Sequence, residues 1–473
     1  MIYIQKNSNY PIYLQIYCKI KEDIEQGNIV HGERLPGIRT LAQTLGIARN
    51  TVNRAYAQLA VEGYIQSKHG SGFLVLDTAN KVTKMNYVQQ DTTSSSMEIS
   101  ELNQPVSPYD FQYGELSYEQ FPFKLWRKYI SQILLSPQKE VVNQYPDKQG
   151  DLLLRQEIKK HLHRSRGMIC CEEQIIVGCG LHYSLDILCK LLAKENNTIA
   201  MEEPGYNGAR DVFINNNYNL HLLPASREGL IISSIYHSGA CAAYVTPSHQ
   251  FPYGTVMPIS QRKELLNWAN ANDAYIIEDD YDSELRYDAN PVPALHSLDA
   301  HDRTIYIGTF SKSLSPSLRV NYMVLPVQML TMYCSLFRSY NSPVSWLTQR
   351  ALAAYMRDEN YESHIRKMCL TYKRRHDVFI QEATKMFGNK VILHGRGAGL
   401  HFVLEFPDGE EQDWLIKQAE KVGVKAYPMI PFWNDQNACP QNMLFTGYSL
   451  LSEQQIREGI ALLQSAWFGT VSK

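Results

Sequence analysis

A polar stretch over residues 79–107 most constrains how this chain can fold, because it divides the sequence into two unequal parts. It contains the run Asp91-Thr92-Thr93-Ser94-Ser95-Ser96 and has little apolar surface to bury. A chain of 473 residues is also too long for one ordinary core. We therefore expect a small domain over residues 1–78, a flexible linker over residues 79–107 and a large domain over residues 108–473.

The first part has the pattern of a winged helix-turn-helix. Apolar residues at helical spacing predict a helix over residues 13–26, a second helix within residues 36–46 and a third over residues 49–62. Residues 63–75 then predict two short strands around a glycine tip. Two helices joined by a tight turn, followed by a hairpin, are typical of this DNA-binding fold.

The second helix of such a pair enters the major groove, where arginine binds guanine and asparagine binds adenine bidentately. The preceding helix and the wing meet phosphates or the minor groove. Residues 1–78 carry eight Lys/Arg against six Asp/Glu, and half of these acids lie in the first helix, away from the reading face. A small helical domain with a solvated polar helix is the alternative, but the whole pattern favours DNA binding. The candidate DNA-contacting residues are Arg39, Arg49, Asn50, Thr51, Asn53, Arg54, Lys68, His69 and Ser71.

The second part alternates apolar runs of strand length with helical patterns. The runs lie at residues 174–177, 198–201, 242–245, 274–277, 304–307 and 321–325. Since most are apolar along their whole length, they predict an α/β domain built on a mostly parallel sheet that is buried on both faces. Long helical stretches follow Val327, and residues 400–406 and 443–448 predict strands of a smaller C-terminal α/β subdomain.

One of these runs leads into Thr309-Phe310-Ser311-Lys312, with Arg319 seven residues beyond the lysine. A site for pyridoxal 5'-phosphate (PLP) needs this set. The catalytic lysine forms a Schiff base with the aldehyde, and hydroxyls with an arginine hold the phosphate. We assign Lys312 to the Schiff base and Thr309, Ser311 and Arg319 to the phosphate. A single Ser-Lys pair is most often a solvated surface pair, so this assignment depends on other parts of the site.

Three further segments supply those parts. The run over 274–277 leads into acids and a tyrosine; a carboxylate can pair with the pyridine nitrogen, and a phenol can bond the ring hydroxyl. A glycine pair opens a helix whose N–H groups suit a phosphate, and a tyrosine after the next strand could stack on the ring. Each has a plainer alternative alone: solvated or metal-binding acids, a common glycine turn, a packed tyrosine. The candidate coenzyme residues are Asp279, Tyr281, Gly180, Leu181, His182 and Tyr206.

Both parts resemble known families. Residues 34–42 and 50–65 look like the signature of the GntR family of DNA-binding regulators. Residues 108–470 resemble the fold-type I aminotransferases, and residues 310–319 look like their lysine motif. The segment that begins at Tyr145 is similar to the one whose tyrosine reaches the phosphate of the partner subunit. That resemblance implies a homodimer in which Tyr145 completes the partner's site.

The two parts in one chain resemble the MocR/GabR family of bacterial regulators over nearly the full length. Residues 246–252 and 278–284 look like that family in particular. The resemblance implies a PLP-dependent DNA-binding transcriptional regulator that senses PLP, an amine or an amino acid through an aldimine at Lys312. Its partners would be a double-stranded DNA operator, a small-molecule effector and a second copy of the chain.

The sequence departs from working aminotransferases at two places. Phe251 stands where they carry an asparagine on the coenzyme's ring oxygen, and phenylalanine cannot donate that hydrogen bond. Residues 444–449, in the strand that carries their carboxylate-binding arginine, contain no arginine. In the two stretches where the GABA-responsive regulator has arginines, here residues 206–210 and 427–431, only Arg210 is close. This argues against GABA and favours a ligand without a carboxylate clamp, or PLP itself.

Two alternatives to the regulator remain open. One is a metabolic PLP-dependent aminotransferase with a vestigial DNA-binding domain, against which Phe251 and the missing arginine argue; weak or half-reaction transamination is compatible with a regulator. The other is a DNA-binding protein whose large domain only dimerises, without a cofactor, against which the lysine set argues.

Composition narrows the remaining classes. The nine cysteines are scattered and form no Cys-x-x-Cys pair, so we expect neither a zinc site nor a disulfide framework. No apolar run reaches the roughly 18 residues that span a bilayer, and the N-terminus resembles no signal peptide. We therefore expect a cytoplasmic protein. The net charge of -2 gives no global sign of nucleic-acid affinity, which a small module can nevertheless carry.

Overall fold

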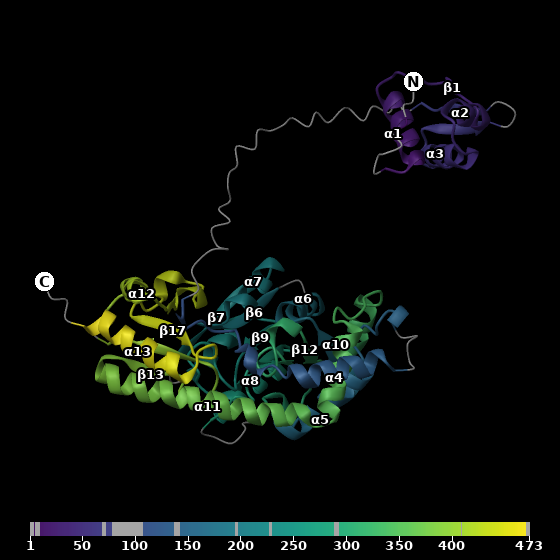
Figure 1. Cartoon of the computed structure of the whole chain (residues 1–473). Coiled ribbons are helices and arrows are strands. Elements are labelled where there is room, and N and C mark those ends of the chain that lie inside the picture. Colours follow the sequence, from purple (N-terminus) through teal and green to yellow (C-terminus); the bar gives the residue numbers. More distant parts are fainter. Residues whose placement is uncertain are drawn as a thin grey trace. The chain divides into compact units, whose positions relative to one another are not determined.

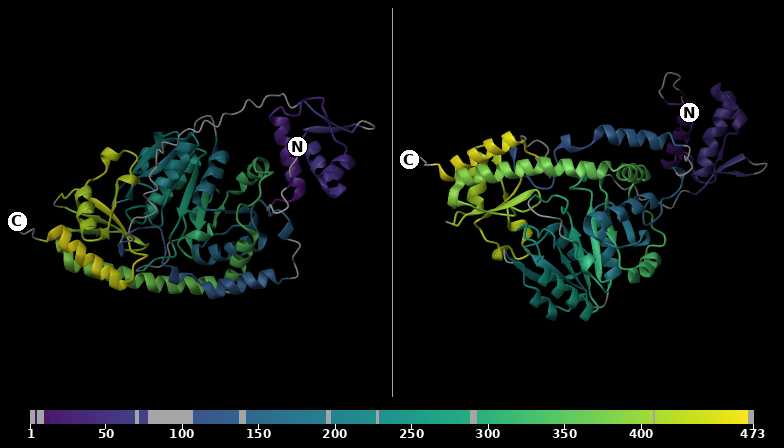
Figure 2. Two further views of the ribbon diagram at one scale, coloured as in Figure 1. Left: turned by 45° about the horizontal axis from the view of Figure 1, so that its top comes forward. Right: turned by 90° about the horizontal axis from the view of Figure 1, so that it is seen from below.

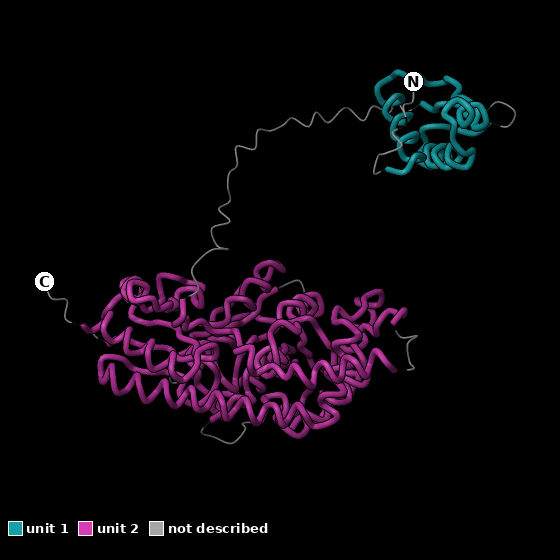
Figure 3. The backbone as a smooth tube through the Cα atoms, in the orientation of Figure 1, with its two compact units in different colours: residues 1–105 teal, residues 106–473 magenta. Residues whose placement is uncertain are grey.

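The computed structural model describes residues 4, 10–68, 72–77, 107–136, 142–193, 197–226, 229–287, 293–407 and 409–469. The chain divides into two compact units, residues 1–105 and 106–473 (Figures 1 and 3). Apart from Ser107, the expected linker lies outside the described residues. Each unit is described by itself.

The N-terminal unit is the winged helix-turn-helix that the sequence predicts. Its core consists of apolar side chains on the inner faces of the helices, among them the buried Ile16, Val52 and Leu59. Gly46 ends the second helix with φ at 64°, a left-handed conformation that glycine adopts without strain. The elements are α1 (Ile12–Glu25), β1 (Arg34–Leu35), α2 (Ile38–Leu45), α3 (Arg49–Val61), β2 (Ile65–Lys68) and β3 (Gly72–Val75). The strands form an antiparallel sheet in the order β1-β3-β2.

The large unit is built on an eight-stranded sheet in the order β5-β12-β11-β10-β9-β6-β7-β8. Its strands are β5 (Ile175–Gly178), β6 (Thr198–Glu203), β7 (Asn219–Ser226), β8 (Gly229–Leu230), β9 (Ala242–Val245), β10 (Tyr275–Asp280), β11 (Thr304–Thr309) and β12 (Asn321–Val324). Strands β7, β6, β9, β10 and β11 run parallel, as expected. Strand β12 is antiparallel to both neighbours, and β8 is antiparallel to β7. The segment between β11 and β12 is too short for a crossover helix, so the chain turns straight back.

Helices cover both faces of this sheet (Figure 1). On one face pack α6 (Leu181–Leu192), α7 (Asn207–Asn215) and α9 (Val327–Leu336). On the other face pack α4 (Phe123–Leu134), α5 (Leu152–Arg166), α8 (Ile259–Ala271) and α10 (Trp346–Arg357). Since the central strands are buried on both sides, their carboxyl ends are the edge where functional side chains can gather.

A C-terminal subdomain adjoins the large sheet, as the sequence predicts. Its elements are α11 (Asn360–Phe387), β13 (Ile392–His394), β14 (His401–Glu405), α12 (Gln412–Lys421), β15 (Val424–Lys425), β16 (Tyr427–Pro428), β17 (Met443–Gly447) and α13 (Glu453–Phe468). The antiparallel sheet has the order β13-β14-β17-β16, and Figure 2 shows α11 and α13 side by side. The first residues of the large unit belong here, because β4 (Tyr109–Asp110) pairs with β15 and the N–H of Gly447 donates to the carbonyl of Phe111 at 2.7 Å.

The described part of the chain has neither a membrane-spanning helix nor a metal-binding cluster. Its helices include none that is both long and apolar enough to cross a membrane. Nor do its His, Cys, Asp and Glu side chains include a group of three or more placed to hold a metal ion.

Candidate functional site

A cavity of about 460 Å³ lies at the carboxyl ends of the central strands, where residues of the large sheet and of the C-terminal subdomain meet. Most of the predicted coenzyme residues line it, although they come from five separate segments. These are Leu181, His182, Tyr206, Asp279, Tyr281, Thr309, Ser311, Lys312 and Arg319. Two predicted residues do not line it: Gly180, which lies beside Arg319, and Tyr145.

Lys312 follows β11, and its amine points at the ring of Tyr113. The Nζ atom donates a hydrogen bond to the carbonyl of Gly114 at 2.7 Å and lies 4.4 Å from the centre of the Tyr113 ring. Burial lowers the pKa of Lys312 from 10.5 to about 8, against the opposing effect of Asp282 and Glu115. At neutral pH this amine is therefore neutral far more often than an exposed lysine, and the neutral amine is the form that attacks a carbonyl.

Arg319 approaches the start of α6 closely. A Cβ atom added to Gly180 would lie 2.2 Å from the Nη2 atom of Arg319, so only glycine leaves room for the guanidinium. The N–H of Gly180 donates to the Oδ1 atom of Asn321 at 2.9 Å. Gly180 thus supplies space rather than the free N–H group that the sequence pattern predicts. Arg319 itself has an exposed side chain and adopts the left-handed conformation, with φ at 51°.

Asp279 is buried at the end of β10 and accepts a hydrogen bond from the phenol of Tyr244. Burial raises the pKa of Asp279 from 3.8 to about 7, against the effect of the Tyr244 hydrogen bond. The described side chains put no lysine or arginine in an ion pair with it. A buried carboxyl in this state gains most from a cationic hydrogen-bond donor, such as a protonated ring nitrogen.

Tyr281 is held by a histidine that the sequence analysis gave no role of its own. The phenol of Tyr281 donates to the carbonyl of His249 at 2.9 Å and lies 3.0 Å from the Nδ1 atom of His249. That nitrogen is 2.8 Å from the Oδ2 atom of Asp282. His249 and Asp282 are both buried, and a Cβ atom at Gly399 would lie 2.2 Å from the His249 ring. His249 therefore has one tightly enclosed position behind Tyr281.

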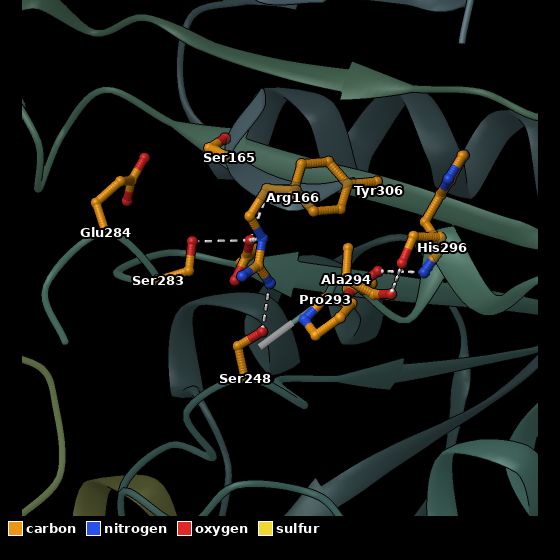
Figure 4. Close-up of polar contacts among 12 residues, drawn as sticks. Ser165, Arg166, Ser248, Ser283, Glu284, Pro293, Ala294, His296 and Tyr306 are labelled. Carbon is orange, nitrogen blue, oxygen red and sulfur yellow. Dashed lines mark hydrogen bonds and ion pairs between the residues drawn. The ribbon is translucent and has the colours of Figure 1, made fainter. Parts of the chain in front are cut away.

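A buried polar network fixes the loops that carry this histidine and this tyrosine (Figure 4). The Nε atom of Arg166, at the end of α5, lies 2.8 Å from the Oδ2 atom of Asp280, and its Nη2 atom donates to the hydroxyl of Ser248 at 2.6 Å. Tyr306 and Ser283 also donate to Asp280, at 2.5 and 2.9 Å. Ser248 and Asp280 belong to the segments at the ends of β9 and β10. The guanidinium thus ties these two neighbouring segments together.

One face of the cavity, here called the polar wall, is formed by Asp279, Tyr281, Thr309, Ser311, Lys312 and Arg319. A second face, here called the aromatic wall, is formed by Tyr113, Phe251, Phe432 and Phe445. The ring centres of Phe432 and Phe445 are 4.7 Å apart, and those of Phe251 and Phe445 are 5.4 Å apart. Phe251, in the place of the aminotransferase asparagine, therefore packs against other rings and offers no hydrogen bond to a ligand.

Arg210 is the one arginine in the two stretches where the GABA-responsive regulator has arginines, and it does not line the cavity. Its Nη2 atom donates to the carbonyl of Pro431 at 2.8 Å. Asn207, one turn earlier at the start of α7, lines the cavity instead. Among the described lining residues, Arg319 is the only one with a guanidinium.

Tyr145 makes no part of the cavity in the single chain. Its side chain is 87% exposed, so it is available to another subunit. The resemblance to aminotransferases assigned it to the partner's phosphate, and that role stays a prediction.

Most of the candidate DNA-contacting residues are exposed on the N-terminal unit. Helix α3 buries Val52, Ala55, Tyr56 and Leu59, which turns its polar side chains outward. The exposed candidates are Arg39, Arg49, Asn50, Asn53, Arg54 and Lys68, while Thr51 is half-buried, and His69 and Ser71 lie outside the described residues. The guanidinium of Arg54 lies 4.1 Å from the centre of the Tyr13 ring on α1, so this side chain also braces two helices.

Two family descriptions match the two units. Residues 12–75 match the bacterial regulatory proteins of the gntR family, and residues 109–428 match the aminotransferases of class I and II. These ranges cover the helix-turn-helix and the residues that line the cavity, except Pro431, Phe432 and Phe445.

Several regulators are similar over nearly the full length. The uncharacterized HTH-type transcriptional regulator YdeL of Bacillus subtilis is 38% identical, with 98% of each chain covered. The probable rhizopine catabolism regulatory protein MocR of Rhizobium meliloti is 32% identical, over 100% of this chain and 97% of that protein. The HTH-type pyridoxine biosynthesis transcriptional regulator PdxR of Corynebacterium glutamicum is 30% identical, over 96% and 95%.

Among solved structures, a kynurenine aminotransferase from Pyrococcus horikoshii superimposes with a TM-score of 0.70. It covers 78% of this chain and 93% of its own, at 24% identity. At this identity the likeness establishes the fold of the large unit and nothing finer.

Proposed function

This chain belongs to the MocR/GabR family of bacterial transcriptional regulators, and on that premise we propose that PLP held at Lys312 controls how its N-terminal unit binds DNA. The observation that carries the proposal is the cavity, in which an amine of lowered pKa, a buried carboxyl and a guanidinium meet. These are the groups that PLP requires.

The residues present fit the coenzyme. Lys312 would hold the aldehyde and Asp279 the ring nitrogen, since that buried carboxyl has a phenol but no cation beside it. Tyr281 would bond the ring hydroxyl. Tyr206, whose ring lies nearly parallel to that of His182, would stack on the ring. The candidates for the phosphate are Thr309, Ser311, Arg319 and the start of α6 at Leu181 and His182, where Gly180 leaves room for the guanidinium.

PLP, when bound, supplies an aldehyde that reacts with primary amines and a ring that withdraws electrons. The chain's own residues set the conditions for this chemistry. Burial leaves the Lys312 amine about half neutral near pH 8, so it can react and can be displaced by another amine. The pair of His249 and Asp282 orients the phenol of Tyr281, and the ring of Tyr113 lies beside the amine of Lys312.

Regulation requires that a ligand bind one arrangement of the protein better than another. Coupling between two sites is typically about 1–3 kcal/mol, which changes affinity by roughly 5- to 150-fold. In a homodimer, two reader units would contact paired half-sites through the candidate residues of α3 and the wing, and Tyr145 would complete the partner's site. The part of the DNA affinity that exposed arginines and lysines provide should fall as the salt concentration rises.

The proposal is tested by capturing genomic DNA fragments on the full-length protein with and without PLP, beside a Lys312→Ala variant. We expect specific fragments that change in yield with PLP for the wild type and do not change for the variant. Capture of no fragment at any salt concentration, together with steady turnover of an amino acid and a keto acid, would instead identify a metabolic aminotransferase.

A further inference from the structure

The aromatic wall adjoins the amine of Lys312, and it holds no charged group. We propose that the effector is a primary amine with an aromatic or otherwise apolar body and without a carboxylate. This inference rests on the proposed function and specifies which class of amine the cavity selects.

The wall begins at Lys312 itself. The Nζ atom lies 4.4 Å from the centre of the Tyr113 ring, whose centre is 5.4 Å from that of Phe445. Phe432 and Phe251 continue the surface, with ring centres 4.7 and 5.4 Å from Phe445. An amine that reaches Lys312 must therefore place its body against these rings. Ring edges and faces at such spacing accept another aromatic group by offset or edge-to-face packing.

The two described arginines at or near the cavity already have other partners or assigned roles. Arg319 is the sole guanidinium among its described lining residues, and the proposed function assigns it to the phosphate. Arg210 donates to the carbonyl of Pro431. Of the other polar lining residues, the proposed function assigns His182 to the phosphate, while Gln112, Asn207 and Thr246 are neutral. The phenol of Tyr427 donates to Asp110 at 2.6 Å.

Among the described residues, a carboxylate on the ligand would therefore find no free cationic partner. Burial of an unpaired charge is costly, because the solvation it loses is not replaced. An amine without a carboxylate avoids this loss of solvation and gains apolar contact with the rings. We expect the difference to exceed about tenfold in affinity, which is the scale of one unmade charge-assisted hydrogen bond.

The test compares 2-phenylethylamine with phenylalanine, which differ only in the carboxylate. The full-length protein is loaded with PLP, and each ligand is titrated against the coenzyme absorption band at equal concentrations of the neutral amine. We expect half-saturation by 2-phenylethylamine at a concentration at least about tenfold lower. Equal or tighter binding of phenylalanine, or no response to either ligand, overturns the inference.

A Phe432→Ala variant tests the wall directly. It should weaken the binding of 2-phenylethylamine about tenfold and leave the coenzyme band unchanged. The matched control is Tyr236→Ala, which removes a half-exposed ring that is not among the lining residues. Wild-type affinity in the Phe432→Ala protein contradicts the inference. A wild-type protein that never develops the band contradicts the proposed function instead, so the two failures are distinguishable.

Discussion

The two walls of the cavity differ in chemistry and in origin. The polar wall comes from the ends of β10 and β11 and the turn before β12, and it carries an amine, a carboxyl, hydroxyls and a guanidinium. The aromatic wall comes from the segment after β4, the loop after β9, the segment after β16 and β17 itself. The polar wall matches the pattern of PLP enzymes, whereas the aromatic wall departs from it at Phe251 and β17.

This difference separates two tasks that an aminotransferase combines. In the proposed function the polar wall, Tyr206 and the start of α6 hold the coenzyme, while the choice of amine depends on the aromatic wall. Substitutions in one wall should therefore leave the task of the other nearly intact.

Replacing Lys312 should have the largest effect. A Lys312→Ala protein lacks the one amine of the polar wall, so it cannot form the Schiff base. The absorption band of lysine-bound coenzyme should therefore disappear. Non-covalent binding through Asp279 and Arg319 should persist at reduced affinity. The matched control is Lys417→Ala, an exposed lysine of α12. An unaltered band in the Lys312→Ala protein rules out the lysine assignment.

Removing the charge of Asp279 should have the next largest effect. An Asp279→Asn protein keeps the size of the side chain but cannot balance a protonated ring nitrogen, so the Kd for PLP should rise roughly 10- to 100-fold. Equilibrium dialysis measures this constant. For comparison, Phe445→Leu in the aromatic wall should alter it less than about threefold. Equal losses in both proteins would show that the two walls do not act separately.

Adding a cation at the cavity should reduce the preference for amines without a carboxylate. An Asn207→Arg protein places a guanidinium at the start of α7, where Asn207 lines the cavity. Binding of phenylalanine should improve about tenfold because the carboxylate gains a partner. Asn207→Gln is the neutral control and should leave the titration as in the wild type. Improvement in both variants, or loss of PLP binding in either, contradicts this prediction.

The smallest expected effect is on the pH dependence of stability without coenzyme. Burial raises the pKa of Asp279 to about 7 from 3.8 and that of Glu284 to about 8 from 4.5. The folded protein thus favours the protonated acids, so their stabilising contribution is full below pH 4 and is lost as the pH rises through 7 to 8. The Tm should therefore fall between about pH 4 and pH 8, and it should fall less for Asp279→Asn. An identical pH profile in both proteins would mean that Asp279 titrates normally.

Much of the fold follows from the sequence, because its signals are local. Apolar residues at helical spacing predicted α1, α2 and α3, and fully apolar runs predicted the central strands of the large sheet. The two-residue strand β1 was missed because two residues give no periodicity. The direction of β12 was not predicted either, since it depends on the short connection from β11 rather than on the apolar run itself.

Most of the polar wall was also predictable, because most of its residues lie at or just after the ends of strands that meet at one edge. The contact of His249 with Tyr281 was not, although residues 246–252 resembled the family motif. It arises from side chains 32 positions apart in neighbouring loops. The aromatic wall depends on packing among Tyr113, Phe251 and Phe445, which are far apart in the chain. No local sequence pattern predicts such a contact.

The central claim is that one lysine holds the coenzyme, and reductive trapping tests it most directly. The full-length protein is saturated with PLP, reduced with borohydride, digested and mapped by mass spectrometry. We expect a single reduced adduct on the peptide that contains Lys312. An adduct on other lysines with Lys312 unmodified, or no adduct at all, would contradict it.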